Sequence, residues 1–223
     1  SQPGISTNKN QGARVATGKI LVFCDSDIEV EPDTLLHTVR ALEQSNGAGA
    51  IMGRVIWKHG PKEGSHDRPR KEDRLYTKDA ASYIEAIYSR YMATYKSIFD
   101  EVGGYDEEVF NMRGEGSDLS MRYWRAGFPL AYNDTIIVHH VFDAPDSIAL
   151  RVAHPEWGIA KDMLLLAYKY DIFDDSNENF IKTVSANFSP LGEKGYFNII
   201  QGIGQFMDVV ADAKPTIDRQ KKD

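Results

Sequence analysis

The chain has 223 residues, enough for one sizeable domain, and its 42% hydrophobic and 26% charged residues are typical of a folded globular protein. Its formal net charge of −7 argues against nucleic acid as the main partner, because binding along a phosphate backbone needs a basic surface. The sequence has no apolar run of the roughly 18 residues that span a bilayer and no basic-then-apolar leader pattern, so we expect no transmembrane segment and a cytoplasmic setting. The one cysteine, Cys24, lies in an apolar run and is predicted to be a buried, inert thiol.

The first elements place two acids at the end of a strand. Residues 1–17 are polar and contain glycine, so we expect an irregular lead-in with a short helix near 12–16. Residues 19–24 are apolar after the first position and rich in β-forming residues, which predicts a buried strand followed directly by Asp25 and Asp27. In open α/β sheets this edge holds the ligand crevice, and paired acids there suit a hard cation that in turn binds a phosphate. The alternative is an Asx-type turn, in which the acids only hydrogen bond to the loop backbone.

The following segments alternate between helix and strand. A helix is predicted to begin at Pro32 and to end near 46–47, where Asn-Gly is a good C-terminal signal. Its apolar residues recur at helical spacing: Leu35, Leu36, Val39 and Leu42. Residues 50–57 are predicted to be a strand. Residues 58–79 are charged and contain glycine and proline, which fits either a solvated surface loop or a mobile lid over an anionic ligand.

The middle of the chain is less regular. Residues 80–91 are aromatic-rich with a mildly helical pattern, and 91–99 are predicted to be a strand. A glycine turn at 103–106 precedes a helix for which Ser117 is the expected N-cap and Gly127 the expected stop.

The last part of the chain ends the predicted domain. Short strands are expected at 130–132 and 135–138, and an amphipathic helix at 159–170. We expect residues 1–175 to form the ligand-binding domain and 176–223 a C-terminal extension that ends in a frayed, charged tail.

Three segments, in this order and spacing, resemble the nucleotide-sugar glycosyltransferases of the GT-A fold, especially the large family 2 group. They are residues 12–27, which end in Asp-Ser-Asp; residues 99–107, which contain Gly-Gly-Tyr-Asp; and residues 114–140, which begin Gly-Glu-Gly-Ser-Asp-Leu. The third segment also resembles the polypeptide N-acetylgalactosaminyltransferases. The resemblance covers roughly residues 4–142 and implies an α/β fold, a Rossmann-like mixed sheet flanked by helices. Because family members normally have two strand–helix units before this point, it also implies an N-terminally shortened domain.

The resemblance implies roles for the acids at the strand end. Asp27 would ligate a divalent cation, Mn²⁺ or Mg²⁺, that bridges the two phosphates of a nucleotide-sugar donor, most often UDP-linked. Asp25 would face the ribose and the water shell of the cation, and we count it with the metal-binding residues. His140 aligns with the family's metal-ligating histidine, whereas His139 should point to the other face of its strand. Such a cation stabilises the negative charge on the departing nucleoside diphosphate.

Three further residues are expected to bind the donor. Asn10 and Arg14 match the segment that lines the nucleotide pocket in the family, and Ser26 lies between the two acids. The sequence does not identify the acceptor or the oligomeric state.

The third segment raises the question of the catalytic base. In inverting family 2 enzymes the second residue of a Glu-Asp pair usually deprotonates the acceptor hydroxyl, but Gly116 occupies that position here. Either Glu115 or Asp118 acts as the base, or the reaction retains configuration and needs no such base, or glycosyl transfer has been lost. We take Glu115 and Asp118 as the candidate catalytic residues and expect Arg122 to form an ion pair.

The main hypothesis is therefore a metal-dependent glycosyltransferase. One competing hypothesis is a reduced GT-A domain that binds nucleotide and metal without transfer, as a sensor or interaction module. Another is an unrelated α/β domain in which the acids hold a purely structural cation.

Overall fold

The structure is a computed structural model. It describes residues 4–58, 64, 66–67, 74–75, 82–84, 87, 89–111, 114–141, 165–166, 168–170 and 212–222. Its labelled helices are α1 (Ile5–Val15), α2 (Thr34–Glu43), α3 (Lys96–Glu101) and α4 (Glu115–Arg125). Its strands are β1 (Ile20–Cys24), β2 (Ile28–Val30), β3 (Ala50–Trp57), β4 (His66–Asp67), β5 (Arg74–Leu75), β6 (Ser82–Ile84), β7 (Tyr91–Tyr95) and β8 (Leu130–His140).

The strands form one mixed sheet, in the order β1-β7-β3-β8-β6-β5, with β2 added to β8 and β4 added to β3. Strands β1 and β3 both run antiparallel to β7, and β3 runs parallel to β8. The carboxyl ends of β1, β3 and β8 therefore meet at one edge of the sheet, together with the amino end of β7. This edge is where ligands bind in open α/β sheets.

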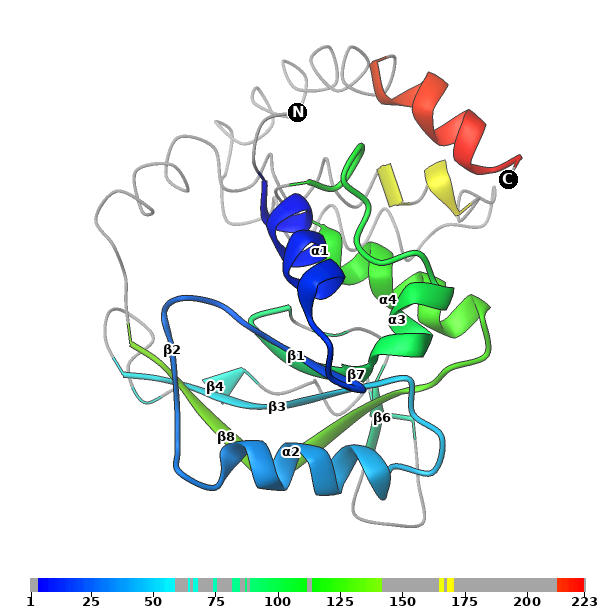
Figure 1. The fold of residues 1–223 in the computed structure, drawn as a ribbon. Helices are drawn as coiled ribbons and strands as arrows, with labels where there is room; N and C mark the ends of the chain where they lie inside the picture. Colours follow the sequence, from blue (N-terminus) through cyan, green and yellow to red (C-terminus); the bar gives the residue numbers. More distant parts are fainter. Residues whose placement is uncertain are drawn as a thin grey trace, which may run out of the picture.

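Helices cover both faces of the sheet: α1, α3 and α4 lie on one face and α2 on the other (Figure 1). Strand β1 shows why its sequence is apolar throughout. Leu21 and Phe23 belong to the core beneath α1 and α4, whereas Ile20 and Val22 pack on the core beneath α2. A strand that is covered on both faces has no polar face to present.

Helix α2 ends as predicted but buries a different face. It stops at Glu43, and the turn beyond it has positive φ at Asn46 (55°) and Gly47 (90°). Its buried residues are Thr34, Thr38, Ala41 and Leu42, whereas Leu35 and Leu36 are exposed. The threonines can be buried because their hydroxyls are satisfied: Thr38 Oγ1 donates to the Thr34 carbonyl at 2.7 Å, and Thr34 Oγ1 donates to the carbonyl of Ile137 at 2.9 Å.

Several element boundaries differ from the predictions. Helix α1 begins at Ile5, well before the short helix expected near 12–16, and β7 stops at Tyr95, where α3 begins. The two short strands expected at 130–138 are one strand, β8, with a register shift opposite Gly53 and Arg54. There the side chain of Asn133 accepts a hydrogen bond from the Thr135 N–H at 2.8 Å, so the break in the apolar pattern is a bulge within one strand.

Helix α4 starts from a glycine rather than from the predicted serine cap. Gly114 is the residue before the helix and has φ of 73°, a left-handed conformation that suits glycine. Ser117 lies inside the first turn and is exposed.

The remaining predictions fall partly outside the described residues. Most of 58–79 and the expected domain boundary at 175 lie outside them, whereas the segment expected to be mildly helical contains strand β6. Residues 165–166 and 168–169 are helical, in agreement with the predicted helix at 159–170.

Residues 212–220 form a helix, so the expectation of a frayed tail there is wrong; this helix packs through Ile217 against Phe110 and Leu165. Among the described helices, none is long and apolar enough to cross a membrane.

Candidate functional site

The loop after β1 brings Asp27 to the end of β8. The Asp25 N–H donates to the Arg90 carbonyl at 2.9 Å, and the Ile28 N–H donates back to the Asp25 carbonyl at 3.1 Å, which turns the chain. Strand β2 then pairs antiparallel with β8, so that Ile28 lies opposite His140. As a result the Asp27 carboxylate lies 3.2 Å from Nε2 of His140.

The two adjacent histidines point in different directions, as the alternation of a strand requires. His140 is buried (3% exposed), and its ring stacks on Trp57 of β3 with ring centroids 4.0 Å apart. Nε2 of His139 instead lies 2.9 Å from the carboxylate of Glu31. The structure thus brings His140, and not His139, to Asp27.

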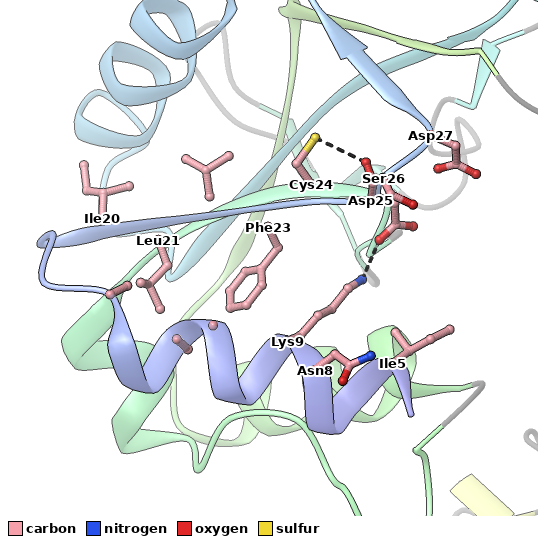
Figure 2. A pocket seen from close by; sticks show the side chains of 14 residues that line it. Ile5, Asn8, Lys9, Ile20, Leu21, Phe23, Cys24, Asp25, Ser26 and Asp27 are labelled. Carbon is pink, nitrogen blue, oxygen red and sulfur yellow. Dashed lines mark hydrogen bonds and ion pairs between the residues drawn. The ribbon is translucent and has the colours of Figure 1, made fainter. Parts of the chain in front are cut away.

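Asp25 lies beside Asp27 in sequence but faces another partner. Its carboxylate forms an ion pair of 3.0 Å with the Lys9 ammonium of α1, which Figure 2 shows reaching across from the helix. Burial raises the pKa of the Asp25 carboxyl, and the charge and hydrogen bond of Lys9 oppose this increase. The two acids of the motif therefore have different partners: Asp25 pairs with the Lys9 ammonium, and Asp27 lies beside the His140 imidazole.

The donor set fits a divalent cation that is bound together with a ligand. Within the described residues, no group of three or more His, Cys, Asp or Glu side chains is arranged to hold a metal ion. Asp27 supplies a carboxylate oxygen, which suits Mg²⁺ or Mn²⁺, and His140 supplies an imidazole nitrogen, a donor typical of transition-metal sites. A cation with so few protein ligands completes its coordination with water and substrate phosphates.

A cavity of about 720 Å³ lies beside these residues, between α1 and β1. One end of it is polar and is lined by Lys9, Asp25, Ser26 and Asp27, and the rest is lined mainly by apolar side chains of α1 and β1 (Figure 2). Cys24 also lines the cavity and is exposed, so the prediction of a buried thiol is wrong. Partial burial raises the pKa of this thiol, and the neighbouring carboxylates of Asp25 and Asp27 raise it further. The higher pKa keeps the thiol in its less reactive, protonated form.

Two of the predicted donor-binding residues have partners elsewhere. The Asn10 side chain donates to the Tyr105 carbonyl and accepts from the Tyr105 N–H, both at 2.8 Å, and so supports the glycine turn. Arg14 is largely exposed and lies 3.3 Å from Glu107. Neither residue lines the cavity. Gly104 in the same turn has φ of 66°, and a Cβ there would lie 2.8 Å from the Asn10 side chain.

Glu115 begins α4 and is buried (9% exposed). Its carboxylate accepts a hydrogen bond of 2.5 Å from the Ser89 hydroxyl. The next residue, Gly116, has no room for a side chain, because a Cβ there would lie 2.8 Å from the backbone carbonyl oxygen of Ile87. The base that family 2 enzymes carry at this position therefore cannot be accommodated here without moving the backbone.

Asp118 is fully enclosed by cationic and hydroxyl groups. Its Oδ2 accepts from Nε and Nη2 of Arg122 at 3.0 and 2.7 Å, which confirms the predicted ion pair. Its Oδ1 accepts from the Tyr170 hydroxyl and lies 2.7 Å from the Lys169 ammonium. The same ammonium lies 2.7 Å from Asp106, the acid of the glycine turn. Asp118 has 0% side-chain exposure, so the prediction that it is a catalytic residue does not fit the geometry.

Sequence reasoning missed Lys9, Ser89 and Trp57. Lys9 is the one with a local signal: it is a basic residue on the helix that leads into the strand ending in the Asp-Ser-Asp motif. Ser89 and Trp57 reach the site only through the sheet topology.

Comparisons with known proteins agree with this architecture. Residues 1–103 match the family described as Glycosyl transferase family 2. Polypeptide N-acetylgalactosaminyltransferase 3 of Taeniopygia guttata is 27% identical over 169 residues, an alignment that covers 62% of this chain and 26% of the relative. The Homo sapiens protein of the same name is 25% identical over 166 residues with the same coverage. The chain therefore spans about a quarter of the length of the curated relatives it matches.

Two solved structures share the fold. The crystal structure of GalNAc-T7 with UDP, GalNAc and Mn²⁺ has a TM-score of 0.52 and 18% identity, and covers 65% of this chain and 31% of that one. The mannosyltransferase PcManGT from Pyrobaculum calidifontis, in complex with GDP-Man and Mn²⁺, has a TM-score of 0.53 and 16% identity, and covers 96% and 56%. The predicted mixed α/β sheet is thus confirmed, and the chain has the GT-A fold of nucleotide-sugar glycosyltransferases and resembles the N-acetylgalactosaminyltransferases in sequence.

Proposed function

We propose that this chain is the donor-binding part of a metal-dependent glycosyltransferase whose donor is a nucleotide sugar, with UDP as the nucleotide. The observation that carries the proposal is the meeting of Asp27 and His140 at 3.2 Å, at the carboxyl edge of the sheet and beside a cavity of about 720 Å³. The solved neighbours support it, since one holds UDP, GalNAc and Mn²⁺ and the other GDP-Man and Mn²⁺.

In this proposal the residues at the strand end hold the diphosphate. Asp27 and His140 would bind the divalent cation, Mn²⁺ or Mg²⁺, which when bound supplies positive charge that stabilises the departing nucleoside diphosphate. Asp25, oriented by Lys9, lines the same polar end of the cavity, where it would accept hydrogen bonds from the donor. Ser26 is exposed at this end and offers a hydroxyl to the donor.

Glu115 is the acid that we assign to the donor sugar. It stands at the start of α4, and Ser89 fixes one of its carboxylate oxygens. Gly116 has no room for an acid, and Asp118 is enclosed by Arg122, Lys169 and Tyr170. Of the acids predicted to be catalytic, Glu115 is therefore the one we retain.

The second candidate is a GT-A domain that binds nucleotide and metal but does not transfer sugar. The specific observation that favours it is the enclosed state of Asp118 together with the lack of space for an acid at position 116. The two candidates differ in sugar release: UDP formed from a UDP-sugar in the presence of Mn²⁺, and not in EDTA, supports catalysis. The cytoplasmic location stays a prediction.

A thermal-shift screen tests the donor class. UDP, GDP, CDP and ADP are each added with and without Mn²⁺ to the wild type, to Asp27→Asn and to the control His139→Ala. A nucleotide at about 100 times its dissociation constant stabilises the folded state by about 2.7 kcal/mol, a shift of several degrees for a domain of this size. We expect this shift for UDP with Mn²⁺ in the wild type and the control, and none in Asp27→Asn. No shift for any nucleotide would contradict the proposal.

A further inference from the structure

A short segment before β7 contacts the loop after β1. We call its described residues, Ile87, Ser89 and Arg90, the linking segment. The Arg90 carbonyl accepts from the Asp25 N–H at 2.9 Å, and the Ser89 carbonyl accepts from the Lys9 ammonium at 2.7 Å. Because Lys9 also pairs with the Asp25 carboxylate at 3.0 Å, the linking segment is fixed both to the backbone and, through Lys9, to the side chain of the first acid.

The same segment contacts the start of α4. The Ser89 hydroxyl donates to the Glu115 carboxylate at 2.5 Å. The Ile87 N–H donates to the Ser120 hydroxyl at 2.9 Å, and that hydroxyl donates to the Gly116 carbonyl at 2.6 Å. One residue, Ser89, therefore carries both connections: its carbonyl faces Lys9 and its hydroxyl faces Glu115.

The close approach of the linking segment explains why position 116 is glycine. A Cβ on Gly116 would lie 2.8 Å from the Ile87 carbonyl oxygen and 3.5 Å from Cβ and N of Ser89. Backbone atoms cannot move away as a flexible side-chain end can, so a side chain here would push the linking segment off the helix. The glycine that replaces the acid of family 2 enzymes thus allows Ser89 to reach Glu115.

The connection is shielded from water for most of its length. The side chain of Lys9 is 11% exposed, and Glu115 is 9% exposed. The Asp25 side chain is more exposed, at 34%. Hydrogen bonds to charged groups are stronger than neutral ones, and more so where water is excluded, so this chain of contacts can fix the separation of its two ends.

We propose that Lys9 and Ser89 are positioning residues that hold the carboxylates of Asp25 and Glu115 in a fixed relative position. Lys9 orients the acid at the phosphate end, and Ser89 orients the acid at the sugar end. This assignment deepens the proposed function and, in its catalytic part, rests on it. The connection can also be tested without catalysis, because a change at Lys9 should alter the stability of the first turn of α4.

Hydrogen exchange measures the connection without activity. In Lys9→Met we expect faster exchange of the amides in the first turn of α4, including the Asp118 N–H that bonds to the Gly114 carbonyl at 2.9 Å. The matched control is Lys19→Met, which removes an exposed lysine. Coupling between two sites is reciprocal, so Ser89→Ala should in turn speed exchange at the Asp25 N–H. Exchange in the first turn of α4 that is equal in Lys9→Met and Lys19→Met overturns the proposal.

Donor turnover measures the catalytic part. Ser89→Ala should lower kcat about tenfold with the donor KM within about twofold, because one hydrogen bond to a charged group is lost while the phosphate end stays intact. Ser89→Thr keeps the hydroxyl and should restore kcat, and Ser117→Ala, which changes an exposed serine of α4, should match the wild type. Lys9→Met should raise the donor KM about tenfold, and Lys9→Arg should recover most of it.

The two sets of results separate the two proposals. Coupled exchange without sugar release shows the connection and refutes the transferase. Sugar release without coupled hydrogen exchange supports the transferase and refutes the connection. A loss of stability in Ser89→Ala with kcat unchanged overturns the positioning role.

Discussion

The ion cluster around Lys169 gives the strongest prediction about stability. Its ammonium lies 2.7 Å from both Asp106 and Asp118, whose side chains are 5% and 0% exposed. The change we consider is Lys169→Met, which keeps the length of the side chain and removes its charge. Asp106 then loses its cation, whereas Asp118 keeps Arg122 at 2.7 Å.

The size of the effect follows from burial. Removing one partner of a buried ion pair costs about 3–5 kcal/mol, because the remaining charge stays buried and uncompensated. The acids here keep some donors: Asp106 still accepts from the backbone N–H groups of Glu108 and Val109, at 2.9 and 3.0 Å. We therefore expect the lower end, about 3 kcal/mol, for Lys169→Met.

Urea unfolding at pH 7 measures this effect as a lower midpoint with an unchanged slope. Lys214→Met is the control, because that lysine belongs to an exposed pair with Asp218 and should change the midpoint little. If Lys169→Met is too unstable to fold, adding Asp106→Asn removes one uncompensated charge and should recover part of the loss. A urea midpoint in Lys169→Met equal to that of the control would contradict the claim that the Lys169 ion pairs stabilise the fold.

The pH dependence has a definite sign. Burial alone would raise the pKa of Asp106, but the hydrogen bond and charge of Lys169 and the two backbone N–H groups outweigh it and lower the pKa below its ordinary value of 3.8. The stability from this group is therefore fully present above the unfolded pKa and is lost as pH falls through the folded pKa. The gap between wild type and Lys169→Met should narrow as the pH is lowered below about 4, and a gap that widens there would contradict the argument.

Three further changes test other parts of the account. Gly116→Ala should destabilise the fold by about 1–3 kcal/mol, because the new Cβ meets the Ile87 carbonyl oxygen. A urea midpoint equal to that of the wild type would contradict this close contact. Tyr170→Phe removes the hydroxyl that donates to Asp118 at 2.7 Å and should cost about 1–3 kcal/mol by the same assay, whereas unchanged stability would show that this hydrogen bond contributes nothing. His139→Ala should leave the Mn²⁺-dependent binding of UDP intact in calorimetry, because the His139 ring faces away from the proposed cation ligands. Loss of UDP binding in this variant would contradict the choice of His140 over His139 as the ligand.

The sequence identified the parts of the site that depend on local pattern. A run of apolar residues ending in two acids marks the end of a strand, and the period of two along β8 separates His140 from His139. Asp27 and His140 meet as predicted because both lie at strand ends that the sheet brings to one edge. Their role as metal ligands remains a prediction.

The errors arise where distant parts of the chain decide the environment. Asp118 was predicted to be catalytic from the acidic motif that resembles the family's, but Lys169 and Tyr170, far along the sequence, enclose it. Leu35 and Leu36 fit the helical period of α2 and are nevertheless exposed, because threonines with internal hydrogen bonds face the sheet instead. The bulge in β8 also interrupts the apolar pattern without ending the strand.

Isothermal titration of UDP in the presence of Mn²⁺, and again in EDTA, is the most direct test of the central claim that Asp27 and His140 hold the cation through which the donor binds. We expect binding to the wild type with Mn²⁺, little heat in EDTA, and loss of the Mn²⁺-dependent binding in both Asp27→Asn and His140→Ala. UDP binding that is equally strong in EDTA, or that survives both substitutions, would contradict the claim.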